Sequence, residues 1–305
     1  MSASRRALLW AIHWEEVARR RCERNWNFGS ELKVCNHMRI HLRACLGLYA
    51  IFLGHVFAVS ATNLARPEPR VIHVFVPLAD NQHQGIVPVP PKLGNGDDPV
   101  HNLFWGAGYG VKTFFARSSE WEMLPSPPSP KPEILERCVF RHRTQNVYLV
   151  ADAYQGSKIG QAVIDFLQAA AGTHPEEVSV RAASRPVTLH AGGAANLVAY
   201  IGHDGLMDFD LSSYPQGTGP NRREAIILAC ISKRFFAAPL RASGAHPLLW
   251  STGLMAAEAY TLKSAIDGWV LREDDEQIRE RAAAAYHQYQ KCSLSAARRL
   301  LVTGW

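Results

Sequence analysis

The chain has 305 residues, of which 47% are hydrophobic and 20% charged, a composition typical of a globular protein with one large domain or at most two. Its formal net charge is +6, but nine Lys and Arg and only four Glu lie between Met1 and Arg43. The remaining chain is therefore close to neutral, which argues against a nucleic-acid partner.

An apolar run at residues 44–61 follows the basic segment and has the layout of a secretory signal peptide. Arg39 and Arg43 supply the positive flank, and the run ends in Val59 and Ala61. We therefore expect an exported protein, periplasmic or secreted. Because the run is only just long enough to span a bilayer, an uncleaved membrane anchor at these residues is the alternative. A buried core helix is a third interpretation, which the glycines in the run and its charged flanks disfavour.

These signals divide the chain into three parts. Met38 is a candidate for the true start, which would make residues 1–37 an upstream extension; with an uncleaved anchor they form a basic cytoplasmic segment. Residues 38–61 are then the signal peptide or membrane anchor. We expect a single α/β domain over residues 62–305.

Export also changes how the cysteines are interpreted, because it would leave only Cys138, Cys230 and Cys292 in the mature chain. In an oxidising compartment an odd number leaves one thiol unpaired, so Cys138 could bridge Cys292 while Cys230 stays free. No two cysteines have the close spacing of a zinc site and the histidines are scattered, so we expect no metal and no cofactor.

The first part of the domain begins with a β-branched segment at 71–78, which predicts a buried strand. A long surface loop is expected at 83–99, which is rich in Pro, Gly, Asn and Asp. Residues 100–117 predict a helix, although the glycines at 106–110 weaken it. Those glycines lack the preceding strand and the lysine of a nucleotide-binding loop. The proline-rich segment 125–132 is expected to be an exposed connector.

Strands and helices alternate through the rest of the chain. Further strands are predicted at 138–140, 147–151, 197–201, 225–229 and 248–252. Helices are predicted at 157–171, 232–242, 256–270 and 273–290, the last of which we expect to pack outside as the final element. Such alternation indicates a mostly parallel central sheet flanked by helices.

Two of these strands are followed by residues of catalytic character. His203 follows the strand at 197–201 and Cys230 follows the strand at 225–229, so parallel pairing would bring an imidazole and a thiol together at the carboxyl edge of the sheet. A cysteine with apolar neighbours is usually core, and a structural histidine is also common. Cys230, however, opens a turn into a helix, whose N-terminal amides would lower the pKa of the thiol.

The local motifs are His203-Asp204-Gly205 and Ala229-Cys230-Ile231-Ser232. In their order and spacing they resemble the caspase-like cysteine peptidases, most closely the Ala-Cys-x-Ser form of the legumain-type branch. The segment 249–253 resembles the strand that follows in that family. The resemblance extends over about residues 71–270 and implies a caspase-like three-layer sandwich.

It also implies a Cys/His dyad that cleaves amide bonds in a peptide or protein. Cys230 would attack the scissile carbonyl, and His203 would protonate the leaving amine and then activate water. The amides of Cys230 and Gly205 would bind the oxyanion. The family usually has His and Gly adjacent, whereas Asp204 separates them here. Asp204 either orients the imidazole or forms a turn, and Asp before Gly favours the turn.

The resemblance places the substrate pocket at the ends of the first strand and of the strand after Cys230. The residues expected there are Asp80, Asn81, Gln82, Ser251 and Thr252. Asp80 would select a basic side chain, unless it only forms a turn.

Asp208 and Asp210 resemble metal ligands, but two aspartates hold a divalent ion poorly, so we expect a solvated loop. Together the features favour an exported cysteine-dependent hydrolase, a peptidase. The competing class is a non-enzymatic binding protein on the same scaffold, in which the loop 83–99 and the glycine-rich region at 106–110 hold a peptide or a cell-wall fragment.

Overall fold

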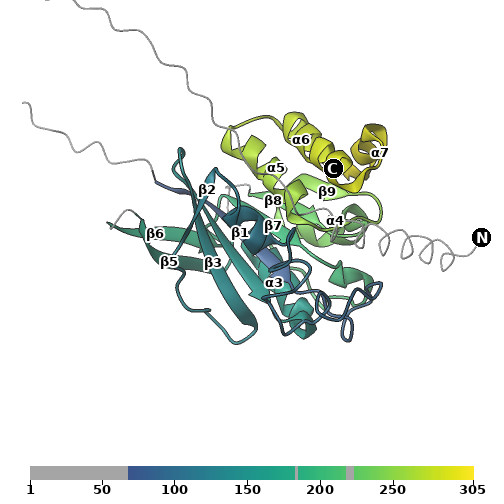
Figure 1. Cartoon of the computed structure of the whole chain (residues 1–305), viewed down its shortest axis with the longest axis horizontal. Coiled ribbons are helices and arrows are strands. Elements are labelled where there is room, and N and C mark those ends of the chain that lie inside the picture. The colour runs from purple at the N-terminus through teal and green to yellow at the C-terminus, as the bar shows by residue number, and fades with distance from the viewer. Residues whose placement is uncertain (1–67, 183–184, 218–222) are drawn as a thin grey trace, which may run out of the picture. The chain divides into compact units, whose positions relative to one another are not determined.

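Eight strands form one mixed sheet in the computed structural model, which describes residues 68–182, 185–217 and 223–305 (Figure 1). Their order is β10-β9-β8-β7-β1-β4-β3-β2. The parallel strands are β4 (Val147–Tyr154), β1 (Arg70–Pro77), β7 (Leu197–Ile201), β8 (Glu224–Leu228) and β9 (His246–Ser251). The antiparallel strands at the edges are β10 (Leu301–Val302), β3 (Ile134–His142) and β2 (Trp121–Leu124).

Helices and a hairpin cover the sheet. On one face α3 (Ile159–Ala171) and α4 (Ser232–Ser243) pack against the parallel strands, beside the hairpin of β5 (Pro175–Ala182) and β6 (Arg185–Gly192). The other layer contains α2 (Val111–Ala116), α5 (Ala259–Val270) and α6 (Asp275–Gln290), and α7 (Leu294–Leu300) packs on α6. The fold is therefore α/β, a large and mostly parallel mixed sheet flanked by helices. These elements belong to one compact unit, Pro67–Trp305.

The core follows from the hydrophobic pattern of the elements. The middle strands β1, β4, β7 and β8 are buried almost throughout, as expected for parallel strands covered on both faces. On α3, Ile159, Val163, Phe166 and Ala170 recur at helical spacing, and all four are buried. The ring of Phe166 lies 5.7 Å from that of Tyr200 on β7, so the helix packs directly beneath the strand that leads to His203.

The helix predicted over residues 100–117 is wrong for most of its length, because only Val111–Ala116 is helical. The chain before it turns tightly on itself. A Cβ atom at Gly106 would lie 2.1 Å from the Val100 carbonyl oxygen, and one at Gly110 would lie 2.3 Å from that of Trp105. Close backbone approach, which glycine allows, therefore replaces the first turns of the predicted helix.

Three other differences concern pairing and missed elements. The strands β3 and β4 are antiparallel, because the four-residue connection 143–146 between them is too short for a parallel crossover. The hairpin β5–β6 and the edge strand β2 were not predicted. Helix α6 is not the last element, because α7 and β10 follow it.

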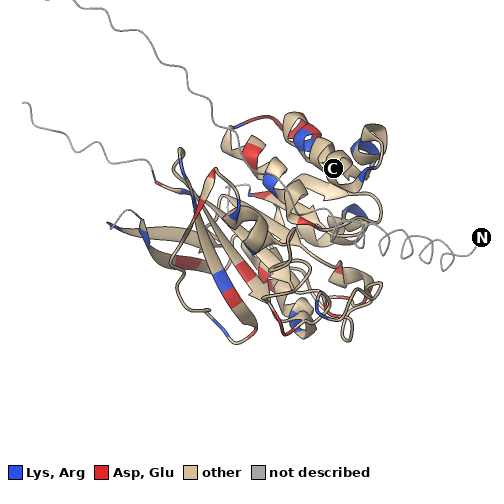
Figure 2. Ribbon diagram, viewed as in Figure 1, with Lys and Arg blue, Asp and Glu red and all other residues tan. Residues whose placement is uncertain are grey.

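Charges of both signs are interspersed over the strands and helices (Figure 2). Within the described ranges no helix combines the length and the apolar character that crossing a bilayer requires. The predicted basic segment at 1–37 and the signal peptide or anchor at 38–61 lie outside the described residues.

Candidate active site

His203 and Cys230 lie just beyond the carboxyl ends of two neighbouring parallel strands. The last register pair of β7 and β8 joins Ile201 to Leu228, and each candidate residue stands two positions after its member of that pair. The Gly202 amide donates to the Leu228 carbonyl oxygen over 3.2 Å, which extends the backbone contact past the strands. The two residues therefore share the edge of the sheet where the sequence predicted them.

The strand order reverses at this part of the sheet. β1 pairs with β4 on one side and with β7 on the other, giving the parallel order β4-β1-β7-β8-β9. In open α/β sheets, ligands bind at such a reversal, outside the carboxyl ends of the strands. Cys230, His203 and the long loop that follows β1 are all placed at this edge.

A carboxylate fixes the imidazole of His203. Its Nε2 lies 2.7 Å from Oδ2 of Asp208, and the histidine is only 8% exposed. An ionised carboxylate can only accept hydrogen bonds, so Nε2 carries the proton and Nδ1 is left as the basic nitrogen. The same Asp208 oxygen accepts a hydrogen bond of 2.9 Å from the amide of Gly85. Asp208 lies in an exposed loop, as expected, and it also contacts the candidate site.

The local fold explains how Asp208 reaches the histidine. A short 3-10 helix, Gly205–Met207, turns the chain back after His203 and brings Asp208 against the ring. The spacing of five residues across a turn marked by Asp204 and Gly205 is the sequence signal that could have identified it.

Asp204 forms the turn, as the preferred interpretation of the sequence predicted. Its Oδ1 accepts a hydrogen bond of 3.0 Å from the Leu206 amide and so caps the 3-10 helix. The side chain is fully buried, and none of the described residues bonds to its Oδ2. Burial above all raises the pKa of Asp204 to about 7, and the negative charge of Asp208 adds to this rise. The orienting role belongs to Asp208.

Gly205 is packed into the interior beside this turn. A Cβ atom there would lie 2.8 Å from the ring of Phe209. Burial above all, and then the charge of Asp204, raise the pKa of Tyr200 well above its ordinary value, while the backbone of Gly205 partly offsets the rise. The Tyr200 hydroxyl donates to the His203 carbonyl oxygen over 2.7 Å. Gly205 is therefore a packed residue of the buried turn.

The Cys230 thiol is partly exposed and lies against the backbone of Met255. Its Sγ is 3.4 Å from the Met255 amide nitrogen and 3.5 Å from the Met255 carbonyl oxygen. Burial raises the pKa of the thiol, the Met255 amide lowers it, and the charge of Asp204 raises it further. The predicted lowering of this pKa is therefore wrong in direction, because desolvation outweighs the favourable amide.

The turn after Cys230 is strained and held from β9. Ile231 has a φ of 53°, in the left-handed region that β-branched residues rarely adopt, at a cost of about 1–2 kcal/mol. Its amide donates to the Gly253 carbonyl oxygen over 2.9 Å. The Ser251 amide donates to Oγ of Ser232 over 2.9 Å, which ties the next residue to the same strand.

Ser251 and Thr252 have structural partners in place of the predicted substrate contacts. Ser251 is fully buried, and its hydroxyl donates to the Ala229 carbonyl oxygen, directly before Cys230. The Thr252 amide donates to the Leu300 carbonyl oxygen over 2.8 Å, and its hydroxyl donates to that of Arg299 over 2.7 Å. Ser251 therefore fixes the backbone beside Cys230, and Thr252 joins the end of β9 to the end of α7.

The residues after β1 organise their own loop. Buried Asp80 accepts hydrogen bonds from the amides of Gln82 and His83, and its Oδ2 lies 2.8 Å from His83 Nδ1. Asn81 exchanges two hydrogen bonds with the backbone of Val89. Gln82 is exposed. The turn-forming interpretation of Asp80 therefore fits the structure, and the pocket selecting a basic side chain does not.

The described cysteines are all free, so the suggested bridge between Cys138 and Cys292 is not formed. Cys138 lies buried on β3, where burial and the charge of Glu136 raise its pKa to about 12. Cys292 is partly exposed and follows α6.

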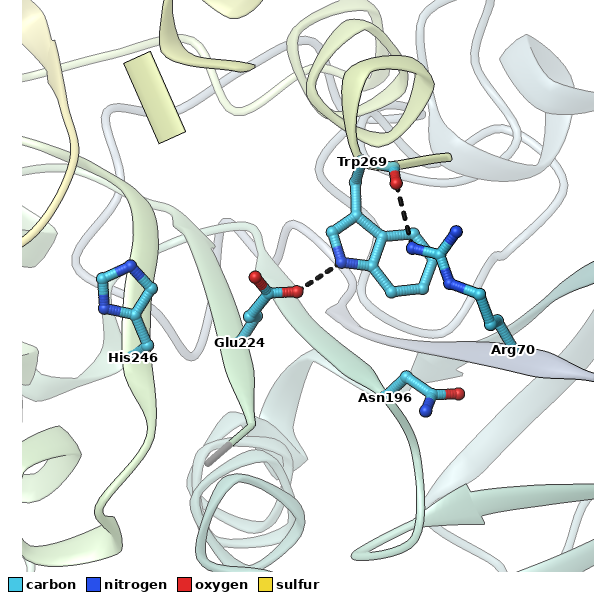
Figure 3. A pocket seen from close by; sticks show the side chains of 5 residues that line it. All are labelled: Arg70, Asn196, Glu224, His246 and Trp269. Atoms are coloured by element: carbon cyan, nitrogen blue, oxygen red, sulfur yellow. Dashed lines mark hydrogen bonds between the residues drawn. The ribbon is translucent and has the colours of Figure 1, made fainter. Parts of the chain in front are cut away.

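A hollow of about 420 Å³ opens at the opposite edge of the sheet, at the amino ends of the strands (Figure 3). It is lined by Arg70, Asn196, Glu224, His246 and Trp269. The Arg70 guanidinium stacks 3.7 Å from the Trp269 ring centroid, and the Trp269 indole donates to Glu224. These contacts join α5 to the strands, at the edge remote from His203 and Cys230.

No family model, curated protein or solved structure matches the chain. Among the residues that the structure describes, no group of three or more His, Cys, Asp or Glu is arranged to hold a metal ion. The functional interpretation therefore depends on the geometry at the carboxyl edge of β7 and β8.

Proposed function

We propose that the chain is an exported cysteine-dependent hydrolase of the caspase-like type, a peptidase. Cys230 is the nucleophile, His203 the general acid and base, and Asp208 the residue that positions the imidazole. The observation that carries the proposal is the placement of thiol and imidazole two positions beyond the same register pair, with Asp208 2.7 Å from the ring. The resemblance of the Ala229-Cys230-Ile231-Ser232 motif supports the same assignment.

The reaction follows from these positions. The Cys230 thiol gives its proton to Nδ1 of His203, and the thiolate attacks the scissile carbonyl carbon. The C–N bond then breaks as the imidazolium protonates the leaving amine, which leaves a thioester on Cys230. His203 next removes a proton from water, the hydroxide attacks the thioester, and the acid and the free thiol are released. Throughout, Asp208 stabilises the positive charge on the ring.

The resting nucleophile is a neutral thiol, because burial raises its pKa. The thiolate therefore forms only when His203 takes the proton, and the amide of Met255, 3.4 Å from Sγ, stabilises the anion. The oxyanion is assigned to the amide of Cys230. Gly205 is left out of this role because it is buried in the turn beside Phe209.

Thiol alkylation tests the proposal without a known substrate. Full-length protein is treated with iodoacetamide, and the rates at Cys230 and Cys292 are followed by mass spectrometry. Without an adjacent base, the raised pKa would make Cys230 react slowly. We expect Cys230 to react at least about tenfold faster than Cys292 near neutral pH, and His203→Ala to abolish the difference. The rate at Cys292 is the internal control for folding and reagent.

Two results would overturn the proposal: a Cys230 rate no higher than that of Cys292, or a rate that His203→Ala leaves unchanged. Either would favour a non-enzymatic binding protein on the same scaffold. The observation in favour of that candidate is the raised pKa of Cys230, which is also what a packed structural cysteine shows.

A further inference from the structure

Three loops surround the candidate dyad, and each presents an exposed apolar side chain. Val87 lies in the loop after β1 and is 50% exposed; Met207 follows β7 and is 40% exposed; Leu254 follows β9 and is 48% exposed. Large apolar side chains that remain in water around a reactive centre commonly mark the surface that binds a ligand.

Leu254 and Met207 each stand next to a direct contact of the dyad, and Val87 lies near a residue that contacts Asp208. Leu254 precedes Met255, whose amide lies 3.4 Å from Cys230 Sγ. Met207 precedes Asp208, which is 2.7 Å from the His203 ring. Val87 lies two residues after Gly85, whose amide donates to the same Asp208 carboxylate over 2.9 Å. The apolar side chains therefore come from segments that are themselves fixed against the thiol and the imidazole.

Two of the carboxylates nearest the dyad are closed to a cationic substrate group. Asp204 is fully buried, and buried Asp80 is bonded within its own loop. Asp208 is exposed, but its Oδ2 is bonded to the imidazole and to the Gly85 amide. Exposed Asp208 and Asp210 are the natural competitors, since they would favour a basic side chain.

We propose that the enzyme selects peptides with large apolar side chains beside the scissile bond, and that Val87, Met207 and Leu254 contact them. This inference rests on the proposed function. Only apolar contact distinguishes the substrates. The preference for leucine over a charged residue beside the scissile bond should therefore be about 10- to 100-fold.

Peptidyl acyloxymethyl ketones that differ in one residue measure this preference on the full-length protein. The Cys230 thiolate forms a bond to the methylene carbon while the C–O bond to the carboxylate leaving group breaks, and His203 retains the thiol proton. Probes with leucine, arginine or aspartate next to the ketone are compared by their second-order rates at Cys230. We expect the leucine probe to react at least about tenfold faster than either charged probe.

Substitution of the exposed apolar residues tests whether they cause the preference for leucine. Met207→Glu and Leu254→Glu should each reduce the ratio of leucine to arginine rates by about tenfold or more. The matched controls are Met123→Glu and Leu271→Glu, which change side chains that are 47% and 58% exposed but lie outside the three loops. Both controls should keep the wild-type ratio.

Iodoacetamide separates this inference from the proposed function, because it carries no side chain to be selected. Slow alkylation of Cys230 by iodoacetamide would remove the proposed function and this inference together. Fast alkylation with equal rates for the three probes, or with the arginine probe fastest, would overturn the apolar preference alone. An unchanged ratio in both Met207→Glu and Leu254→Glu would also overturn it.

Discussion

Asp208 gives His203 a defined tautomer, and this is the strongest chemical feature of the site at the scale of single residues. The carboxylate holds the proton on Nε2, which leaves Nδ1 as the atom able to accept the thiol proton. Asp204, one residue after the histidine, has a different role: it caps the turn and remains fully buried. Asp208 therefore orients the imidazole, whereas Asp204 fixes the backbone of the turn.

Asp208→Asn should slow the alkylation of Cys230 by on the order of 10²-fold. The asparagine amide can donate to Nε2, which favours the tautomer with the proton on Nδ1 and blocks that atom as a base. Stopped reactions analysed by mass spectrometry measure the rate. Asp210→Asn, an exposed aspartate in the same loop, should leave it unchanged. Equal rates for wild type and Asp208→Asn would contradict the positioning role.

Asp204→Asn should change how stability depends on pH. The pKa of Asp204 in the folded protein is raised from 3.8 to about 7, so between about pH 4 and pH 7 the folded state keeps a proton that the unfolded chain has released. The contribution of Asp204 to stability therefore falls as pH rises through this window and stays low above it. A shift of one pKa unit corresponds to 1.36 kcal/mol, so the ionisation of Asp204 lowers the free energy of unfolding by roughly 4 kcal/mol at the most.

Asparagine never ionises but keeps the acceptor for the Leu206 amide. Urea unfolding at pH 5 and pH 8 should therefore show the variant gaining stability relative to wild type at the higher pH. The same difference in free energy of unfolding at both pH values would contradict a titrating Asp204.

At the scale of elements, the hairpin β5–β6 is joined to the sheet by buried charges. Arg137 on β3 makes a two-pronged ion pair with Asp152 on β4, with both distances 2.6 Å, and also pairs with Glu176 on β5. His73 on β1 lies 3.0 Å from Asp152 through Nε2 and accepts the Gly192 amide at Nδ1 over 3.0 Å. Both strands of the hairpin are therefore bonded to this network.

Removing the central cation should destabilise the protein. Arg137→Met leaves the buried Asp152 without its main partner and should lower the free energy of unfolding by about 3–5 kcal/mol. Arg141→Met is the matched control on the same strand. Arg141 pairs with Glu122 at a half-exposed position, so its loss should cost about 1 kcal/mol or less. Urea denaturation measures the free energy of unfolding of both variants. Similar decreases in the two variants would show that the buried network stabilises the protein no more than the exposed ion pair does.

At the scale of the whole molecule, the order of strands and helices between residues 197 and 290 could be predicted from the hydrophobic pattern and the turn residues. The strand predicted at 197–201 is β7, and the helix predicted at 232–242 nearly coincides with α4 (Ser232–Ser243). These segments have clear apolar runs and turn residues at their ends. The hairpin β5–β6 has mixed burial and many charged residues, so its strands depend on tertiary pairing that local pattern does not encode.

The site was predictable to the same extent. His203 and Cys230 could be placed because each directly follows a buried strand. Asp208 was missed, because its contact depends on a 3-10 turn that folds it back onto the ring, and only the turn residues Asp204 and Gly205 signalled it in the sequence. The direction of the Cys230 pKa was also missed, because a thiol's desolvation depends on what packs around it.

The free cysteines give a prediction for the domain as a whole. Protein denatured in the presence of iodoacetamide and without reductant should be alkylated at Cys138, Cys230 and Cys292. Peptide mapping by mass spectrometry reads this directly. A peptide pair joined through Cys138 and Cys292 would contradict the structure.

The contacts of the turn after Cys230 determine when during folding this part of the candidate site can form. Gly253 holds the strained backbone of Ile231, and Ser251 holds Ser232. Ser251 ends β9, and Gly253 follows it. Residues 251–253 leave the ribosome more than twenty residues after Cys230. The turn that follows Cys230 therefore gains these bonds late in folding, so a truncated or half-made chain carries the cysteine without the backbone geometry around it.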